Sequence, residues 1–391
     1  MNSVNLCKEY CTGCGLCHSV YGVELISDEK DFLCPEISKD MVDELLKVCP
    51  CGGKATYEMS ERDVWGNKEG VYLGWSSDSD IRKQASSGGI LTSLCIYLLN
   101  KGMVDGVIQT VADNVYGTKT VISRTKEEVL NCMGSRYSVS APLYSIKNIV
   151  KQNETYVFVG KPCDVSALRM YLKEDSSLNK QIVYLFSFFC AGTPSGDAQK
   201  KLLKELGCSD RSECSSLQYR GNGWPGFATV AKKDGSEARI SYNDSWGKIL
   251  GRDVRKMCRF CIDGIGEMAD ISCGDAWYLN ENNEPDFSEK EGRNVIFTRN
   301  EKGHELLKRA IDDGAIVAKE YENYEELKYI QKYQYERRAT MKSMITGLRI
   351  CKVEAPMYSK KLMKSYRGNV PAKIRTKRML GIVKRVLKGK I

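Results

Sequence analysis

The chain has 391 residues, of which 42% are hydrophobic and 28% are charged, as in an ordinary globular protein of two or three domains. No apolar run reaches the roughly 18 residues that a membrane-spanning helix needs. The N-terminus also lacks a secretory pattern, so we expect a cytoplasmic protein. The net charge of +9 is concentrated in residues 360–391, which hold 12 Lys or Arg and no Asp or Glu. We therefore expect no nucleic-acid partner.

Cysteine usage is the strongest functional feature of the sequence, which contains 17 Cys. In a reducing compartment, a high density of cysteines indicates metal ligands or catalytic thiols rather than a disulfide framework. Residues 1–55 are rich in cysteine and loop-like, and we predict a small ferredoxin-like iron–sulfur module there.

Residues 70–345 alternate predicted strands and helices, which favours an α/β core with a mixed sheet. Apolar periodicity predicts strands or strand–helix units over 71–75, 89–102, 104–111, 156–172 and 181–207. Antiparallel strands are expected over 217–246, and helices over 300–316 and 322–345. Residues 346–391 form a basic C-terminal tail, with a helix expected after Pro371. The fold class is therefore α/β, or α+β mixed, with a module at 1–55 and a tail at 346–391.

The first cysteine cluster has the pattern CxxCxxC followed by a distant cysteine before proline, and its members are Cys11, Cys14, Cys17 and Cys49. This spacing is the ferredoxin pattern for a 4Fe–4S cluster. A zinc site is the alternative, although zinc usually joins two separate CxxC pairs. Cys51 and Cys34 are alternatives for the fourth ligand. Gly13 and Gly15 let the loop curl and present N–H groups to the sulfurs.

Several motifs occur in a characteristic order after this cluster: ASSGGILTSLCIYLL, GSRYSVS, GKPCDVSAL, FFCAG, YRGNGWPG, CRFC and ADISCGDAW. The order resembles the coenzyme F(420) hydrogenase/dehydrogenase beta-subunit family, which includes 7-hydroxymethyl chlorophyll a reductase. The resemblance covers roughly residues 5–345. It implies a flavin, FAD or FMN, together with one or more 4Fe–4S clusters on one chain, and does not require coenzyme F(420) itself.

The flavin is expected at a serine- and glycine-rich turn that precedes a helix starting at Ile90. A serine hydroxyl at the N-cap, free N–H groups and the helix dipole would together attract a phosphate. Ordinary helix capping is the alternative. The predicted cofactor-binding residues are Ser86, Ser87, Gly88, Gly89, Gly134, Ser135, Arg136, Tyr137 and Gly160. A surface salt bridge of Arg136 and a core position for Tyr137 are equally ordinary interpretations. No GxGxxG follows a strand, so a Rossmann site is not supported.

A second cysteine set is centred on the CxxC pair Cys258 and Cys261, which is half a site. Two further thiols, Cys163 and Cys190, follow predicted parallel strands, whose carboxyl ends gather in one crevice. The family resemblance also marks these four cysteines, so we predict a second 4Fe–4S cluster beside the flavin, with zinc as the alternative. Cys273 is interpreted as a core cysteine, and Asp275 as a turn residue rather than a cofactor ligand.

These features predict an oxidoreductase in which electrons from ferredoxin, or from a deazaflavin such as coenzyme F(420), pass through the clusters to the flavin. The flavin would then reduce an organic or lipid-linked substrate, which at the level of the family suggests surface-polysaccharide synthesis. The alternative function is a non-catalytic electron-relay subunit of a larger complex. Catalytic residues are unknown; the candidate proton donors are Tyr137, Lys161 and Asp164.

The tail after Pro371 has apolar residues at helical spacing, namely Met379, Ile382, Val383, Val386 and Leu387. Lysines and arginines occupy the rest of the helix, which predicts contact with an anionic membrane surface or with an acidic partner such as ferredoxin. A peripheral position at the inner membrane face would follow from the first option. A disordered, solvated tail is the alternative.

Overall fold

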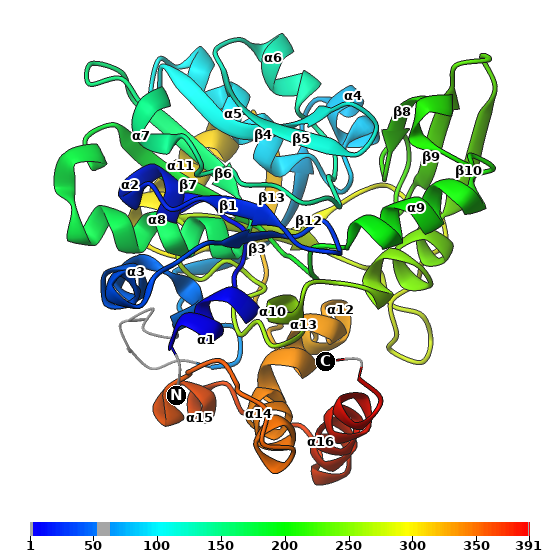
Figure 1. Cartoon of the computed structure of the whole chain (residues 1–391). Helices are drawn as coiled ribbons and strands as arrows, with labels where there is room; N and C mark the ends of the chain where they lie inside the picture. The colour runs from blue at the N-terminus through cyan, green and yellow to red at the C-terminus, as the bar shows by residue number, and fades with distance from the viewer. Residues whose placement is uncertain (1–2, 53–62, 390) are drawn as a thin grey trace.

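An eight-stranded mixed sheet forms the centre of the protein in the computed structural model, which describes residues 3–52, 63–389 and 391 (Figure 1). The strand order is β13-β3-β12-β11-β7-β6-β4-β5. The strands are β3 Gly70–Ser76, β4 Gly106–Asp113, β5 Gly117–Ser123, β6 Tyr156–Gly160, β7 Ile182–Phe188, β11 Ile271–Asp275, β12 Asn294–Thr298 and β13 Ile316–Glu320. This sheet confirms the predicted mixed α/β fold.

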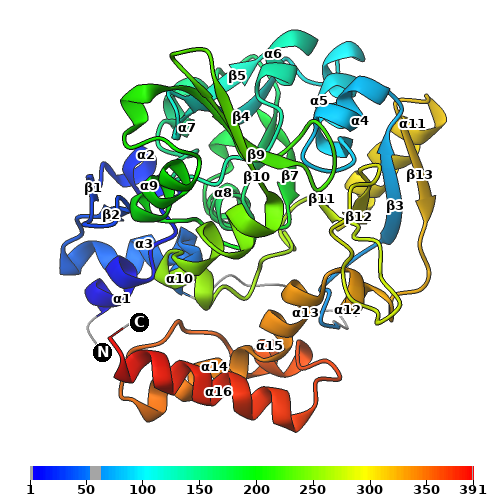
Figure 2. The same ribbon diagram turned by 90° about the vertical axis from the view of Figure 1, so that its right-hand side faces the viewer.

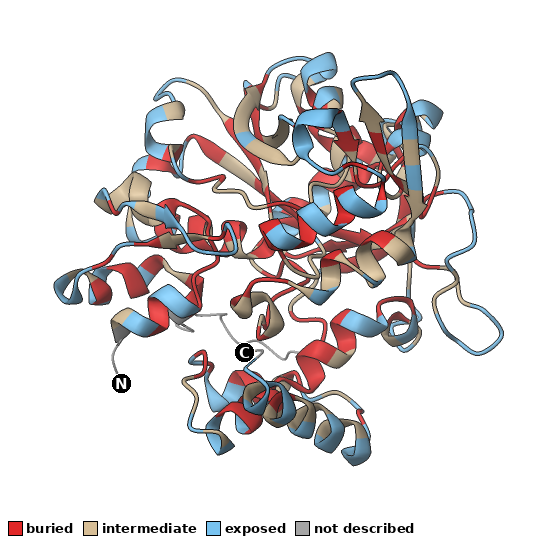
Figure 3. Ribbon diagram, turned by 45° about the vertical axis from the view of Figure 1, so that its right-hand side comes forward, coloured by how far each residue is buried: buried red, intermediate tan, exposed pale blue. Residues whose placement is uncertain are grey.

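The four inner strands β4, β6, β7 and β11 are parallel, and the flanking strands on both sides are antiparallel. Helices α5 (Ile90–Asn100), α8 (Pro162–Glu174) and α9 (Gly196–Glu205) follow β3, β6 and β7. Because parallel strands end at the same edge, the loops after β6 and β7 emerge side by side. Buried residues concentrate in this sheet, and exposed residues on the outer faces of the helices (Figure 3).

A smaller antiparallel sheet and a set of short helices complete the core. The sheet contains β8 Cys214–Gln218, β9 Phe227–Lys232 and β10 Glu237–Ser241, as predicted for 217–246. The short helices are α4 Ser79–Gln84, α6 Lys126–Asn131, α7 Ile146–Ile149, α10 Lys256–Arg259, α12 Leu327–Ile330, α13 Lys332–Ala339 and α14 Met341–Ile350. Helix α11 (Glu301–Asp312) matches the predicted helix at 300–316, whereas the predicted helix at 322–345 is divided among α12, α13 and α14.

The two ends of the chain share one hydrophobic core (Figure 2). The N-terminal segment contains α1 Ser3–Glu9, α2 Leu16–Tyr21, β1 Leu25–Ser27, β2 Leu33–Pro35 and α3 Val42–Val48. Its residues Leu6, Tyr10 and Leu45 belong to the same buried cluster as Met344 and Tyr366. The domain boundaries remain a prediction, and residues 53–55 of the predicted module lie outside the described residues.

The basic tail forms helix α16 (Ala372–Leu387) after α15 (Lys360–Ser365), as predicted. Helix α16 lies beside α14 (Figure 2), where Ile382 is 1% exposed. A Cβ at Gly347 of α14 would lie 2.8 Å from the Met379 carbonyl oxygen, so a glycine permits the close approach of the helices. Of the predicted apolar stripe, Ile382 and Val386 therefore pack inside the protein, whereas Leu387 is exposed. Within the described part of the chain, no helix is long and apolar enough to cross a membrane.

Replacing Ile382 by Ala should loosen α16. Deleting a buried isoleucine side chain costs about 2–4 kcal/mol, so amides of α16 should exchange hydrogen faster in mass-spectrometric hydrogen exchange. The matched control is Leu380→Ala on the same helix, because Leu380 is 56% exposed. Equal exchange in the two variants would contradict the packing of α16 on α14.

Candidate redox site

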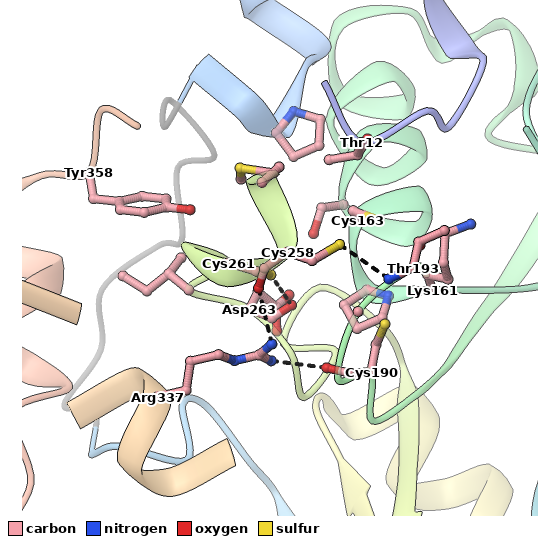
Figure 4. A pocket seen from close by; sticks show the side chains of 16 residues that line it. Thr12, Lys161, Cys163, Cys190, Thr193, Cys258, Cys261, Asp263, Arg337 and Tyr358 are labelled. Atoms are coloured by element: carbon pink, nitrogen blue, oxygen red, sulfur yellow. Dashed lines mark hydrogen bonds between the residues drawn. The ribbon is translucent and has the colours of Figure 1, made fainter. Parts of the chain in front are cut away.

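Four cysteines from three separate chain segments line one pocket (Figure 4). They are the four predicted for the inner cluster: Cys163, Cys190, Cys258 and Cys261. Cys163 lies in the first turn of α8, Cys190 follows β7, and the CxxC pair spans α10 and the turn after it. The structure therefore brings together thiols that are separated by almost 100 residues in the sequence.

The inner thiols are partly buried and lie close to one another. Burial, with the neighbouring Cys258 acting in the same direction, raises the pKa of the Cys190 thiol to about 12. Burial likewise raises the pKa of Cys261 to about 11. The Thr193 N–H donates to Cys258 Sγ at 3.3 Å, Cys261 Sγ donates to the Asp263 carbonyl at 3.1 Å, and Cys163 Sγ lies 4.0 Å from Asp164 Oδ1. A metal that bound these thiols would displace their protons.

The N-terminal cysteines are also brought together, in the loop before α2, the first turn of α2 and the turn after α3. Burial, with Cys49 acting in the same direction, raises the pKa of Cys11 to about 11 and that of Cys17 to about 12. The Gly13 N–H donates to Cys11 Sγ at 3.2 Å, as the loop sequence predicts. A Cβ at Gly15 would lie 2.8 Å from the Tyr144 nitrogen, so glycine lets this loop pack against residues 141–144.

Of the three candidates for a fourth ligand of this first site, Cys49 lies nearest to the whole CxxCxxC run in its electrostatic effect. Cys49 raises the pKa of each of the three thiols of the run, Cys11, Cys14 and Cys17. Cys51 lies behind it, with the Cys49 and Cys51 sulfurs 3.2 Å apart. Cys34, which lies on β2, faces Asp28, and its sulfur is 3.9 Å from the Asp28 carboxylate. Among the described residues, no group of three or more His, Cys, Asp or Glu converges as the ligands of a single metal ion.

The two cysteine sites adjoin. Thr12 and Pro50, which come from the two loops of the N-terminal site, also line the pocket of the inner cysteines. Thr12 follows Cys11 and Pro50 follows Cys49, so both loops of the N-terminal site supply a residue to the lining of the inner pocket. The order of the sites through the protein is therefore N-terminal cysteines, then inner cysteines.

A second and larger pocket, of about 490 Å³, adjoins the pocket of the inner cysteines. This volume is typical of small-molecule and cofactor sites. Its lining includes the predicted residues Ser86, Ser87, Gly89, Gly134, Ser135, Arg136, Tyr137 and Gly160. Gly88 is not part of the lining: a Cβ there would lie 2.8 Å from Asn294 Oδ1, so Gly88 packs this loop against β12. Cys190, Lys161, Gly192 and Thr193 line both pockets.

The turn before α5 differs in detail from the predicted phosphate seat. The helix begins at Ile90 as predicted, but its N-cap is Gly89, with φ of 78°, rather than a serine. Ser86 Oγ accepts a hydrogen bond from the Ser135 N–H at 2.7 Å, and Ser87 Oγ donates to the Arg293 carbonyl at 2.9 Å. The prediction of a serine N-cap was therefore wrong, because the hydroxyls join this turn to neighbouring loops.

Arg136 is a cation of this pocket whose hydrogen-bond donors are incompletely paired. It donates to the carbonyls of Ser135 and Met133, at 3.1 and 3.3 Å, and its buried Nε has no hydrogen-bond acceptor. Burial lowers the pKa of the guanidinium. A buried donor without an acceptor is costly, which indicates a ligand acceptor in the pocket.

The three candidate proton donors line the same pocket but have structural partners. Asp164 Oδ2 accepts from the Lys161 N–H at 2.9 Å and pairs with Lys161 Nζ at 2.8 Å, which caps the start of α8. Lys161 Nζ also donates to Ser140 Oγ at 2.7 Å. Tyr137 packs on Tyr219 and Trp246, and its carbonyl accepts from Gln199.

Sequence reasoning missed an aromatic and charged wall of the large pocket. Arg220 makes two hydrogen bonds of 3.0 Å to the Asp275 carboxylate and lies over the Tyr242 and Trp277 rings. Trp224 Nε1 donates to the same carboxylate at 2.8 Å. Asp275 therefore holds Arg220 and Trp224 in the pocket wall. The YRGNGWPG motif, which contains both of these residues, is the part of the sequence that could have indicated this wall. Cys273 is a buried core residue on β11, as predicted.

Comparison with known proteins places this architecture in a family. Residues 71–147 match the model for the N-terminal part of the coenzyme F(420) hydrogenase/dehydrogenase beta subunit, and residues 153–324 match the model for its C-terminal part. A solved structure of the F(420)-reducing nickel–iron hydrogenase complex from Methanosarcina barkeri shares the fold, with a TM-score of 0.59 at 21% identity. That similarity covers 78% of this chain and 100% of the other.

The curated relatives are named as parts of redox enzymes. The coenzyme F(420) hydrogenase subunit beta of Methanococcus voltae is 26% identical over 70% of this chain and 92% of its own length. The F(420)-dependent formate dehydrogenase 1 subunit beta of Methanococcus maripaludis is 27% identical over 64% and 61%. The coenzyme F(420)-dependent sulfite reductase of Methanocaldococcus jannaschii is 25% identical over 84% of this chain but only 49% of its own length. The chain belongs to the coenzyme F(420) hydrogenase/dehydrogenase beta-subunit family.

Proposed function

We propose that the protein is an iron–sulfur flavoprotein that relays electrons between a one-electron carrier and a hydride-transferring partner. The observation that carries the proposal is the shared wall of the two pockets, in which Cys190 and Lys161 line both. The proposal assigns one 4Fe–4S cluster to each set of four cysteines and FAD or FMN to the large pocket. A ferredoxin is the expected one-electron partner, and a deazaflavin such as coenzyme F(420) the expected hydride partner.

The residues present fit iron–sulfur ligation. The inner site offers four thiols in the lining of one pocket. In a cubane each thiolate binds a different iron, so the thiols stand further apart than around one zinc ion. Backbone N–H groups reach the sulfurs of Cys11 and Cys258, and such contacts tune cluster potentials.

The large pocket fits a planar cofactor that carries hydrogen-bond acceptors. Its walls combine aromatic rings with the buried Arg136, whose Nε lacks an acceptor. A flavin bound there would supply the conversion between hydride pairs and single electrons. Lys161, which pairs with Asp164 and donates to Ser140, lies in the common wall of the two pockets.

A relay role is better supported than a self-standing reductase of an organic substrate. The most informative relatives are named as beta subunits of hydrogenase and formate dehydrogenase. The candidate proton donors are engaged in capping and packing, as expected of a protein that positions cofactors. A role in reducing a lipid-linked or polysaccharide precursor has no comparable support.

Anaerobically purified protein should contain about eight iron atoms and one flavin per chain. Replacing Cys261 by Ala should remove about four iron atoms, because one cubane loses a ligand. The matched control is Cys208→Ala, a buried cysteine that lines neither pocket, which should keep the full content. Iron and flavin analysis checks both variants; unchanged iron in the Cys261 variant, or zinc in place of iron, would refute the inner site.

Replacing Arg136 by Gln should weaken flavin binding about tenfold or more, because hydrogen bonds from a charged group contribute roughly 1.5–3 kcal/mol. Flavin released on dilution, followed by its fluorescence, measures this effect. The control is Arg349→Gln, an exposed arginine on α14. Retention of flavin by the Arg136 variant at the wild-type level would place the cofactor elsewhere.

We also propose that α16 contacts an anionic membrane surface, through the side that faces away from α14. Leu380 and Leu387 are 56% and 78% exposed and are seven residues apart, on one face of the helix. Exposed lysines flank them on that face: Lys373, Lys377, Lys384 and Lys388. Leucines between lysines suit a helix lying in the headgroup region, because each lysine near an anionic surface contributes about 1 kcal/mol.

Vesicles of phosphatidylglycerol and phosphatidylcholine should bind the protein in co-sedimentation, and added salt should weaken the binding. The double variant Leu380→Ser and Leu387→Ser should reduce binding at least about tenfold, because burying each leucine contributes roughly 1.5–3 kcal/mol. Ile26→Ser, on β1, is the exposed control. Equal vesicle binding by the leucine double variant and the Ile26 variant would exclude the membrane as the partner of α16. Absence of vesicle binding, together with binding of an acidic ferredoxin, would also exclude it.

A further inference from the structure

A buried arginine reaches the inner cysteines from helix α13. Arg337 is 4% exposed and lines the same pocket as the four thiols. Its Nη2 donates to the Cys190 carbonyl at 2.9 Å and its Nη1 to the Cys258 carbonyl at 3.4 Å (Figure 4). The guanidinium therefore lies against two of the three segments that supply the thiols.

The charge of Arg337 has no carboxylate partner in the part of the chain that the structure describes. The next residue, Arg338, is equally buried but pairs with Glu267 and Asp263. Among the described residues, Arg337 has only carbonyl and amide acceptors, and its buried Nε has none. Burying a cation without a counter-charge is unfavourable, so this position requires an anion that the protein itself does not supply.

The N-terminal cysteines have an equivalent arginine. Arg255 is 4% exposed, and its guanidinium donates to the Cys11 carbonyl at 3.1 Å and to the Leu33 carbonyl at 2.9 Å. Within the described residues, the Arg255 Nε has no acceptor and the guanidinium forms no ion pair with a carboxylate. Each cysteine site is thus matched with one buried, uncompensated arginine. Lys161 beside the inner site differs, because Asp164 neutralises it.

We infer that Arg337 and Arg255 are the buried counter-charges of the two cysteine-bound clusters and set their reduction potentials separately. The inference rests on the proposed function. Reduction of a 4Fe–4S cluster adds one electron and no proton, so the cluster becomes more negative by one unit. A fixed cation in a site of low dielectric constant stabilises that added charge and raises the potential. The hydrogen bonds to backbone carbonyls hold each guanidinium beside its own cysteine site.

The test is a potentiometric titration of the anaerobically purified holoprotein, monitored by electron paramagnetic resonance. The Cys261→Ala variant, which retains only the N-terminal cluster, assigns the two signals. Arg337→Gln should lower the equilibrium constant for reduction of the inner cluster about tenfold, or about 59 mV for a one-electron couple, and leave the other cluster unchanged. Arg255→Gln should have the reciprocal effect. Arg337→Lys, which keeps the charge, should restore most of the lost potential.

Full iron content with unchanged potentials in both Gln variants would overturn the inference while leaving the proposed function intact. A Lys variant with a potential as low as that of the Gln variant would also overturn it, because the arginine would then act through its shape alone. If Arg337→Gln fails to retain iron, the potentials of Arg337→Lys and Arg255→Gln decide by the same criteria. Wild-type protein without iron would refute the proposed function itself. Arg349→Gln is the control for loss of one positive charge.

Discussion

The parallel pairing of β6 with β7 is the constraint on which the site depends. Gly160 lies opposite Ser187 in this pairing, and Ser187 Oγ donates to the Gly160 carbonyl at 3.0 Å. The chain that follows each strand therefore emerges at the same edge of the sheet, so Cys163 and Cys190 face one cavity. A shift of register by one residue would exchange the faces of the strand and separate the two thiols. The segment that carries Cys258 and Cys261 reaches the same edge and completes the set of four thiols.

The C-terminal helices hold that segment in place. Arg338 of α13 donates to the Val64 and Ile262 carbonyls, at 2.7 and 2.5 Å, and pairs with Glu267. These contacts fix the turn that follows Cys261 from the side opposite the sheet. The core shared by the two ends of the chain continues this support to the N-terminal cysteines. A fold in which both termini brace the cysteine loops is suited to sites that must hold their geometry through changes of charge.

Local patterns predicted most of the fold, because each strand–helix unit carries its own periodicity. The cysteine sets were also predictable, since strand ends converge by a general rule and CxxCxxC is a local motif. The remainder depends on contacts between distant residues. Arg220 meets Asp275 across 55 positions, and Arg337 meets Cys190 across 147. The N-cap at Gly89 was missed because the serine hydroxyls bond to loops that no local pattern brings near. The sequence likewise did not reveal that one side of α16 faces inward, because that side packs on α14, a separate helix.

The central claim is that two iron–sulfur clusters occupy the two cysteine sites in sequence beside the large pocket. The most direct measurement is a crystal structure of the anaerobically purified protein, with an anomalous difference map recorded at the iron absorption edge. The account predicts two strong iron peaks, one enclosed by Cys11, Cys14, Cys17 and Cys49 and the other by Cys163, Cys190, Cys258 and Cys261. A single peak, or a peak at the zinc edge among either set of thiols, would contradict it.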